Sequence, residues 1–111
     1  MRAAVVEISK LGQLPSSDAA IANADAESLL EKFDRLITSI QEPVTDEEAR
    51  VLLRVLRSDE DECFGLATTI VTLVETAPSW PLWDSLADTG HVWIRKLRYR
   101  ASRGDELPTK A

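Results

Sequence analysis

The stretch SDEDECFG, residues 58–65, places four consecutive acidic side chains directly before the only cysteine of the chain. Carboxylates and thiolates can bind metal ions, and a thiolate can also act as a nucleophile. Acidic residues can equally begin a helix or attract a basic partner. The stretch therefore raises four hypotheses: metal binding, thiol chemistry, helix capping and partner recognition. The residues concerned are Asp59, Glu60, Asp61, Glu62 and Cys63.

The surrounding sequence favours neither metal binding nor thiol chemistry. A calcium loop needs ligands at alternate positions and a central glycine, which DEDE lacks. A structural zinc site needs about four ligands, whereas the chain has one cysteine and one histidine, Cys63 and His91. The acidic neighbours are expected to raise the pKa of the thiol, and the glycines are too scattered to cradle a phosphate. We expect a buried unreactive cysteine, a structural or exposed histidine, no metal, no cofactor and no enzymatic activity.

Charge is distributed unevenly along the 111 residues, whose net charge is −6. Residues 1–62 carry 14 acids and 7 bases, whereas residues 63–111 carry 5 acids and 6 bases. An acidic half repels phosphates and attracts basic groups, so the charge disfavours nucleic acid and favours a basic protein partner. The single cysteine predicts a reducing, cytoplasmic location, and no apolar run approaches the roughly 20 residues of a membrane span.

Three of the six aromatic residues are tryptophans, namely Trp80, Trp83 and Trp93. We expect Trp83 and Trp93 to pack over one end of a central helix, because large aromatic rings bury much apolar surface. Trp80 lies in a turn beside two prolines and is expected to be partly exposed. An exposed tryptophan would be a natural anchor for a partner.

Helices must position these residues. Apolar side chains at helical spacing predict a helix from Asp25 toward Ile40, with Asp25 as its cap and Pro43 as its terminator. Glu31 and Arg35 are spaced to form an ion pair on it. A capping box predicts a second helix over 45–57, whose buried face is Ala49, Leu52, Leu53 and Leu56. Residues 1–20 stay poorly defined, as a strand or an irregular helix.

A third helix is predicted over 60–77, where a narrow threonine stripe interrupts apolar residues on most sides. Ser58 or Asp59 would cap it, and the other acids would lie in its first turn. Four acids exceed what capping requires. Phe64 falls among the buried positions, and Gly65 is expected to let a neighbouring helix approach closely.

The remaining chain predicts two more helices and a tail. A short helix is expected from Ser79, its cap, and a final helix over 88–103 should turn Trp93, Ile94, Leu97 and Ala101 inward. Residues 104–111 should form a loose tail. The sequence therefore predicts one all-α domain, residues 1–111: a compact bundle of about four to five helices with a HEAT-like helical hairpin, 45–57 and 60–77, at its centre.

The segment TDEEARVLLRVLRSDEDECFGLATTIVTLVETAPSWPLW, residues 45–83, resembles small all-helical actinobacterial-type proteins. Some of these resemble immunity proteins encoded beside polymorphic toxins. The resemblance covers about a third of the chain and supplies no catalytic or ligand residue. It implies an inhibitor that covers or plugs the active site of a toxin.

We therefore expect a non-enzymatic protein-binding module, and specifically an immunity-type inhibitor that binds a toxin domain with a basic surface. In this hypothesis the carboxylates of residues 59–62 steer association, and Trp80 anchors the contact. Two alternatives stay open. One is a helical adaptor subunit that self-associates, and the other is an RNA-binding module that uses the basic residues of the last helix.

Overall fold

Helices are the regular elements of residues 1–106, the part of the chain that the computed structural model describes, with side chains through Ser102. No strand occurs in this part, which confirms the all-α prediction. The described residues form six α-helices and one 3₁₀ helix, more than the four to five helices expected. In chain order they are α1 (Ala3–Leu11), α2 (Ser17–Ala22), α3 (Ala24–Thr38), α4 (Asp46–Val55), α5 (Leu66–Val74), η1 (Trp83–Leu86) and α6 (Val92–Glu106).

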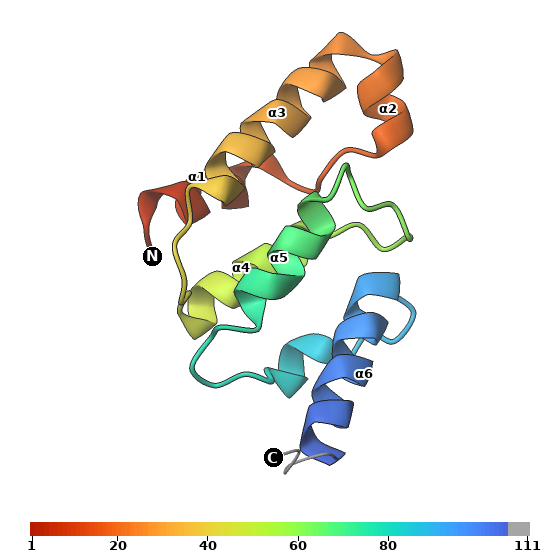
Figure 1. Ribbon diagram of the computed structural model, residues 1–111. Helices are drawn as coiled ribbons and strands as arrows, with labels where there is room; N and C mark the ends of the chain where they lie inside the picture. Colours follow the sequence, from red (N-terminus) through yellow and green to blue (C-terminus); the bar gives the residue numbers. More distant parts are fainter. Residues whose placement is uncertain (107–111) are drawn as a thin grey trace.

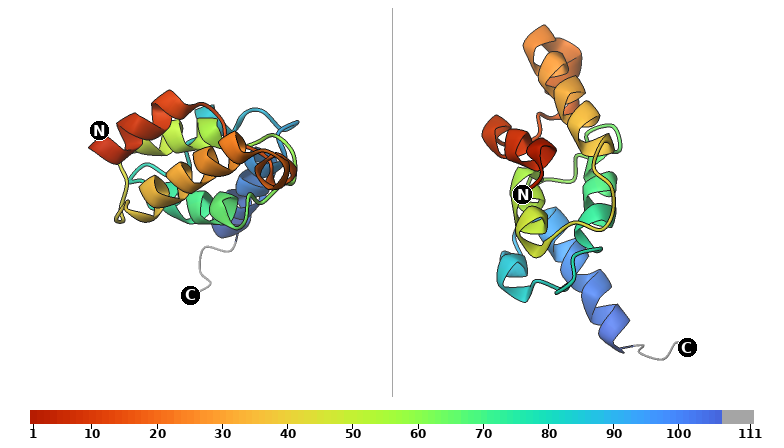
Figure 2. Two further views of the ribbon diagram at one scale, coloured as in Figure 1. Left: turned by 90° about the horizontal axis from the view of Figure 1, so that it is seen from above. Right: turned by 90° about the vertical axis from the view of Figure 1, so that its left-hand side faces the viewer.

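The helices follow one another along the bundle. The α4 and α5 helices lie in the middle, α2 and α3 lie toward one end, and α6 lies toward the other (Figures 1 and 2). The α1 helix packs on α3 and α4, α5 packs on α4 and α3, and η1 packs on α6. The α2 and α3 helices and the α6 helix therefore occupy opposite ends of the molecule, whereas α1 lies beside α3 and α4.

The core is built mainly on α4 and α5. The predicted buried face of α4 is confirmed, and Val51 and Val55 are buried beside it. The α5 helix is apolar on most sides, and its threonine stripe lies at the surface or half-buried, as its sequence pattern predicts. Burial of a side chain such as Leu52 or Ile70 stabilises the fold by roughly 2 kcal/mol. The buried residues of α5 are Leu66, Ala67, Ile70, Val71, Leu73 and Val74.

The additional helices come from the N-terminal segment, which the sequence pattern left undefined. Val5 and Ile8 of α1 are fully buried, so this short helix is held by tertiary packing rather than by propensity. The α2 helix begins after Ser16, whose hydroxyl accepts a hydrogen bond from the Ala19 N–H at 3.0 Å. Between the two helices, buried Leu14 donates its N–H to the Val55 carbonyl at 3.0 Å.

The helix predicted from Asp25 toward Ile40 is confirmed as α3, but its predicted cap is wrong, whereas the predicted cap of α4 is correct. Thr45 and Glu48 form the predicted capping box. The cap of α3 is Asn23, whose side chain accepts from the N–H groups of Asp25 and Ala26, so Asp25 lies inside the helix. The predicted ion pair between Glu31 and Arg35 does not form among the described residues, which leaves the Glu31 carboxylate without an ion-pair partner.

The third predicted helix begins late and ends early, because α5 spans only Leu66–Val74. Cys63, Phe64 and Gly65 have φ angles of 51°, 57° and 90°, which are left-handed and cannot continue a right-handed helix. Neither Ser58 nor Asp59 caps α5, and Gly65 precedes it without a side-chain cap. A Cβ at Gly65 would meet no atom within 4 Å, so the predicted close approach of a neighbouring helix does not explain this glycine. Its positive φ does, because glycine adopts that conformation without steric strain.

The C-terminal part departs from its prediction at both ends. No helix begins at Ser79, and only the short η1 helix, Trp83–Leu86, forms in this region. The predicted inward face of α6 is confirmed, since Trp93, Ile94, Leu97 and Ala101 are buried. The helix continues to Glu106, past the expected start of the tail at 104, and residues 107–111 lie outside the described part.

Candidate protein-binding surface

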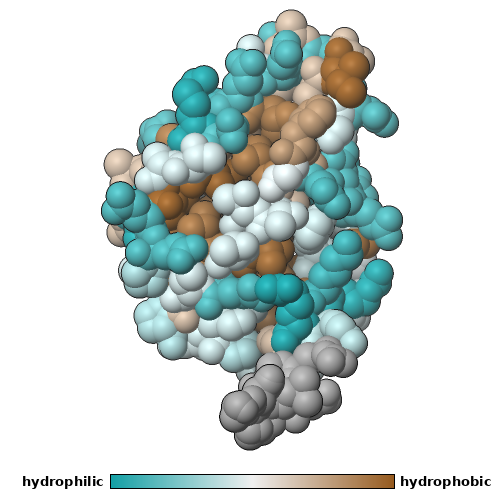
Figure 3. All heavy atoms as spheres, viewed as in Figure 1, coloured by the Kyte–Doolittle hydropathy of each residue, from teal (hydrophilic) through white to brown (hydrophobic). Residues whose placement is uncertain are grey.

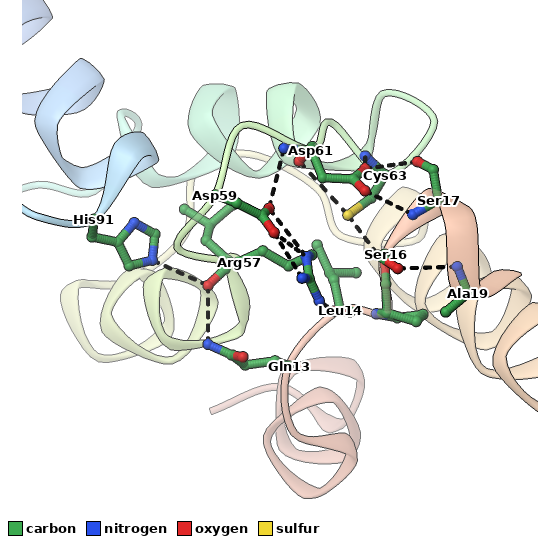
Figure 4. Close-up of polar contacts among 12 residues, drawn as sticks. Gln13, Leu14, Ser16, Ser17, Ala19, Arg57, Asp59, Asp61, Cys63 and His91 are labelled. Carbon is green, nitrogen blue, oxygen red and sulfur yellow. Dashed lines mark hydrogen bonds and ion pairs between the residues drawn. The ribbon is translucent and has the colours of Figure 1, made fainter.

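The four acids form a loop, residues 58–65, that connects α4 to α5, and its first carboxylate is paired within the chain. The Asp59 carboxylate accepts hydrogen bonds from Arg57, with Nη2 to Oδ2 at 2.7 Å and Nε to Oδ1 at 3.1 Å (Figure 4). These bonds lower the pKa of Asp59 and raise that of Arg57. Half of the Asp59 side chain remains exposed, at 52%. Its negative charge is therefore balanced locally by Arg57, which directly precedes the loop.

Asp61 fastens the same loop to the start of α2. Its carboxylate accepts the Ser17 N–H at 2.8 Å, the Ser17 hydroxyl at 2.7 Å and the Cys63 N–H at 2.8 Å (Figure 4). Burial opposes the charged form of Asp61, but the hydrogen bonds from Ser17 and Cys63 outweigh it and lower the pKa. Asp61 is therefore a structural residue that joins segments 44 residues apart.

Replacing Asp61 with alanine is expected to destabilise the fold by about 1–3 kcal/mol, because a charged acceptor of three hydrogen bonds is lost. Urea unfolding monitored by circular dichroism measures the change as a lower midpoint at an unchanged slope. Glu62→Ala is the matched control, since that carboxylate makes no hydrogen bond or ion pair in the described part of the chain. Equal midpoints for the two variants would contradict the assigned role of Asp61.

Cys63 is fully buried, as predicted. Its thiol donates to the Pro15 carbonyl at 3.3 Å. Burial and then the charge of Asp61 raise the pKa of Cys63 to about 12. The thiol therefore stays protonated at neutral pH and lacks the thiolate needed for nucleophilic attack or metal binding.

His91 has a structural role at the start of α6. Its Nδ1 accepts the Ile94 N–H at 3.3 Å, so Nε2 carries the proton. Nε2 donates this proton to the Leu56 carbonyl at 3.1 Å, the bond drawn from the His91 ring in Figure 4. Both ring nitrogens are therefore occupied by the backbone. Over the described residues, no group of three or more His, Cys, Asp or Glu side chains converges to hold a metal ion.

The other two acids of the loop, Glu60 and Glu62, point their charge to solvent. Both are exposed, and neither carboxylate forms a hydrogen bond or ion pair with a described residue. The four carboxylates that were predicted to point outward therefore have two different environments. Asp59 and Asp61 hold the loop together, and Glu60 and Glu62 are exposed to solvent.

The end of this loop presents a large apolar side chain that the sequence pattern placed in the core. Phe64 is 64% exposed because its left-handed backbone turns it out of the α5 register. Ile21, on α2, is 77% exposed. Two adjoining cavities, of about 190 and 420 Å³, both have Leu30, Glu31 and Phe64 in their walls.

Acidic side chains surround these apolar groups. Glu27, Glu31 and Asp34 lie on one face of α3 and line the two cavities, whereas none of the lining residues is basic. Hydrophobic side chains gather over the seam between α3 and α5, with hydrophilic ones beside them (Figure 3). We call this region the Phe64 surface and define it as Ile21, Glu27, Leu30, Glu31, Asp34, Glu60, Glu62 and Phe64.

The tryptophans lie away from this surface and only partly follow their predictions. Trp80 is half-buried and packs against the core, which limits it as an anchor. Trp93 is buried, as expected, with the Lys96 Nζ 4.5 Å from its ring centroid. Trp83 is 41% exposed, contrary to expectation, because η1 directs it to the surface beneath the guanidinium of Arg98.

The described basic side chains of α6 make contacts within the C-terminal half, and none of them forms an ion pair with an acid of residues 1–62. Arg100 forms a bidentate ion pair with Glu75 of the α5 C-terminus, at 2.7 and 2.8 Å. Arg95 donates to the Thr89 carbonyl, and Arg98 donates to the Leu86 carbonyl. Arg95 and Arg98 each keep further N–H donors, whereas the charge of Arg100 is paired with a carboxylate.

No family model, curated protein or solved structure matches this chain. Among the described residues, no helix combines the length and the hydrophobicity that a bilayer span requires.

Proposed function

We propose that this chain is a non-enzymatic protein-binding module and that the Phe64 surface contacts a partner with a basic surface. The observation that carries this proposal is the exposed ring of Phe64 beside two cavities whose lining carboxylates form no ion pair with a described residue. Protein interfaces typically combine a desolvated aromatic centre with a polar rim. The Phe64 surface has both parts.

The two parts contribute differently to binding. Exposed carboxylates such as Glu60 and Glu62 chiefly accelerate association with a basic protein and lose this effect as salt screens them. Affinity comes from burial of Phe64 and Ile21, since desolvated apolar side chains dominate most interfaces. Phe64 and Ile21 therefore provide the apolar centre of the interface, which the four acidic residues of the loop alone would lack.

The specific partner that we propose is a toxin domain with a basic surface, which makes the chain an immunity-type inhibitor. The resemblance of residues 45–83 to immunity proteins supports this choice, and so does the acidic character of the Phe64 surface. A HEAT-like pairing of α4 with α5 and a cytoplasmic location belong to the same proposal. The single cysteine, kept as a buried thiol, is compatible with a reducing compartment.

Charge reversal of Glu60 and Glu62 tests the proposal. The variant Glu60→Lys/Glu62→Lys is expected to associate about tenfold more slowly with the protein encoded by the adjacent gene at low salt, and the difference should shrink at high salt. Stopped-flow fluorescence measures both rates. Asp59 and Asp61 are left unchanged because their replacement would also disrupt the loop.

Glu7→Lys/Glu42→Lys is the control for net charge, since both residues are exposed and lie outside the Phe64 surface. The proposal predicts that this double reversal slows association much less than the reversal of Glu60 and Glu62. Equal association rates for the wild type and the double variant at low salt would exclude steering by Glu60 and Glu62. Absence of any binding to the adjacent gene product would exclude the immunity-type role.

A self-associating adaptor is the second candidate, and the opposite charges of the two ends favour it. The acidic Phe64 surface and the basic residues of α6 lie at different places on one chain, so a second copy could pair them head to tail. Light scattering across a range of concentrations distinguishes this arrangement, because a monomer of constant mass excludes it. RNA binding is less favoured, since a net charge of −6 repels the phosphates of a nucleic acid.

A further inference from the structure

We propose that the smaller cavity of the Phe64 surface receives one arginine side chain of the partner protein. This inference rests on the proposed protein-binding function and names the group that the surface recognises. The cavity has a volume of about 190 Å³. Its lining residues are Leu30, Glu31, Asp34, Cys63, Phe64 and Leu66.

The cavity has the size and the layered chemistry of an arginine site. Its volume is that of about six liquid waters. An arginine side chain has a similar number of non-hydrogen atoms, so its size suits the cavity. Leu30 and Leu66 provide apolar walls for the methylene groups, and Phe64 provides an aromatic wall. Glu31 and Asp34 provide carboxylates for a cationic end.

The two carboxylates have no cationic partner in the part of the chain that the structure describes. Neither Glu31 nor Asp34 forms an ion pair or a side-chain hydrogen bond with a described residue, and no lining residue is basic. Lys32 and Arg35 belong to the same helix but line neither this cavity nor the larger one beside it. Two negative charges beside an apolar wall therefore favour a ligand with a positive group on an apolar stem.

Arginine fits this combination better than lysine. A planar guanidinium stacks on an aromatic face and donates two parallel hydrogen bonds to a carboxylate, whereas an ammonium is a compact and strongly hydrated charge. Phe64 and Glu31 offer these two contacts in one cavity. The adjoining cavity, with Ala20, Ile21 and Glu27 in its wall, leaves room for the residues that flank the arginine in the partner.

The test is a titration of the isotopically labelled full chain with three small probes, followed by NMR. N-acetyl-arginine amide is expected to produce saturable shifts at Phe64, Leu30 and Asp34. N-acetyl-lysine amide should bind about threefold more weakly because it gains less from the aromatic wall. N-acetyl-citrulline amide, which keeps the shape but lacks the charge, should produce no saturable shift.

Matched variants locate the binding. Glu31→Gln/Asp34→Asn and Phe64→Ala should each weaken arginine-amide binding by about fivefold or more, since each removes one of the two contacts. Glu7→Gln, an exposed acid on α1, should leave it unchanged. Equal binding of arginine and citrulline amides, absence of saturable shifts, or shifts spread over all exposed acids would overturn the inference. If the arginine probe fails while Glu60→Lys/Glu62→Lys still slows partner association, the arginine site is wrong and the protein-binding function stands.

Discussion

Replacing Glu48 with alanine is expected to destabilise the protein by roughly 3 kcal/mol, because its buried carboxylate joins separate segments of the chain. Its side chain is only 2% exposed. It accepts the Arg2 N–H and Nε–H, both at 2.9 Å, and the Thr45 N–H at 2.9 Å. Loss of the carboxylate would leave these three donors without their acceptor and would open a cavity between α1 and α4.

The same carboxylate makes stability depend on pH. Burial would raise the pKa of Glu48, but the N–H groups of Arg2 and Thr45 and the Arg2 guanidinium outweigh it and lower the pKa from 4.5 to about 2. A depressed pKa means that the unfolded chain binds the proton more readily than the folded chain. The contribution, roughly 3 kcal/mol, is therefore fully present above pH 4.5 and is lost as the pH falls through about 2.

Urea unfolding between pH 7 and pH 2 measures both effects. The difference between wild type and Glu48→Ala should be largest at neutral pH and should shrink as the solution is acidified. Glu47→Ala is the matched control, because Glu47 occupies the same first turn of α4 but is exposed. A loss for Glu47→Ala as large as that for Glu48→Ala would mean that the effect comes from the helix dipole and not from the buried contacts.

The sequence predicted this capping box and missed its long-range role. The spacing of Thr45 and Glu48 is a local signal, and both reciprocal hydrogen bonds form. The contacts from Arg2 join residues 46 positions apart, and no local pattern encodes such a pairing. The start of α1 was unreadable for the same reason, since burial of Val5 and Ile8 by other helices stabilises it.

The loop at 58–65 shows how a local signal can mislead. Consecutive acids before an apolar run are typical of a helix start, and they led to a predicted helix over 60–77. Asp61 instead accepts from Ser17, and Asp59 pairs with the preceding Arg57, so both carboxylates stabilise a loop. The late helix start moves Phe64 from a core position to the surface.

The candidate site was therefore only partly predictable. Exposure of Glu60 and Glu62 follows from their charge, which strongly disfavours burial without a partner. Exposure of Phe64 follows from three successive left-handed residues, and only the glycine among them is a sequence signal for that conformation. Trp80 is partly exposed, as expected, but it packs against the core, and we therefore propose Phe64 as the anchor in its place.

Phe64→Ala is expected to weaken binding of the adjacent gene product by about 30-fold or more, the effect of removing an aromatic side chain at the centre of an interface. The stability of the unbound protein should change by only about 0.5 kcal/mol or less, because most of the ring is already in solvent. A folded variant that binds poorly would separate the recognition role of Phe64 from any structural role.

Isothermal titration calorimetry of this variant beside Trp83→Ala tests the central claim most directly. Trp83 is also an exposed aromatic residue, but it lies on η1, outside the Phe64 surface. We predict that Phe64→Ala loses most of its affinity for the adjacent gene product and that Trp83→Ala binds as the wild type does. Wild-type affinity in Phe64→Ala would contradict the claim. A large loss of affinity in Trp83→Ala beside it would place the interface at the other end of the molecule.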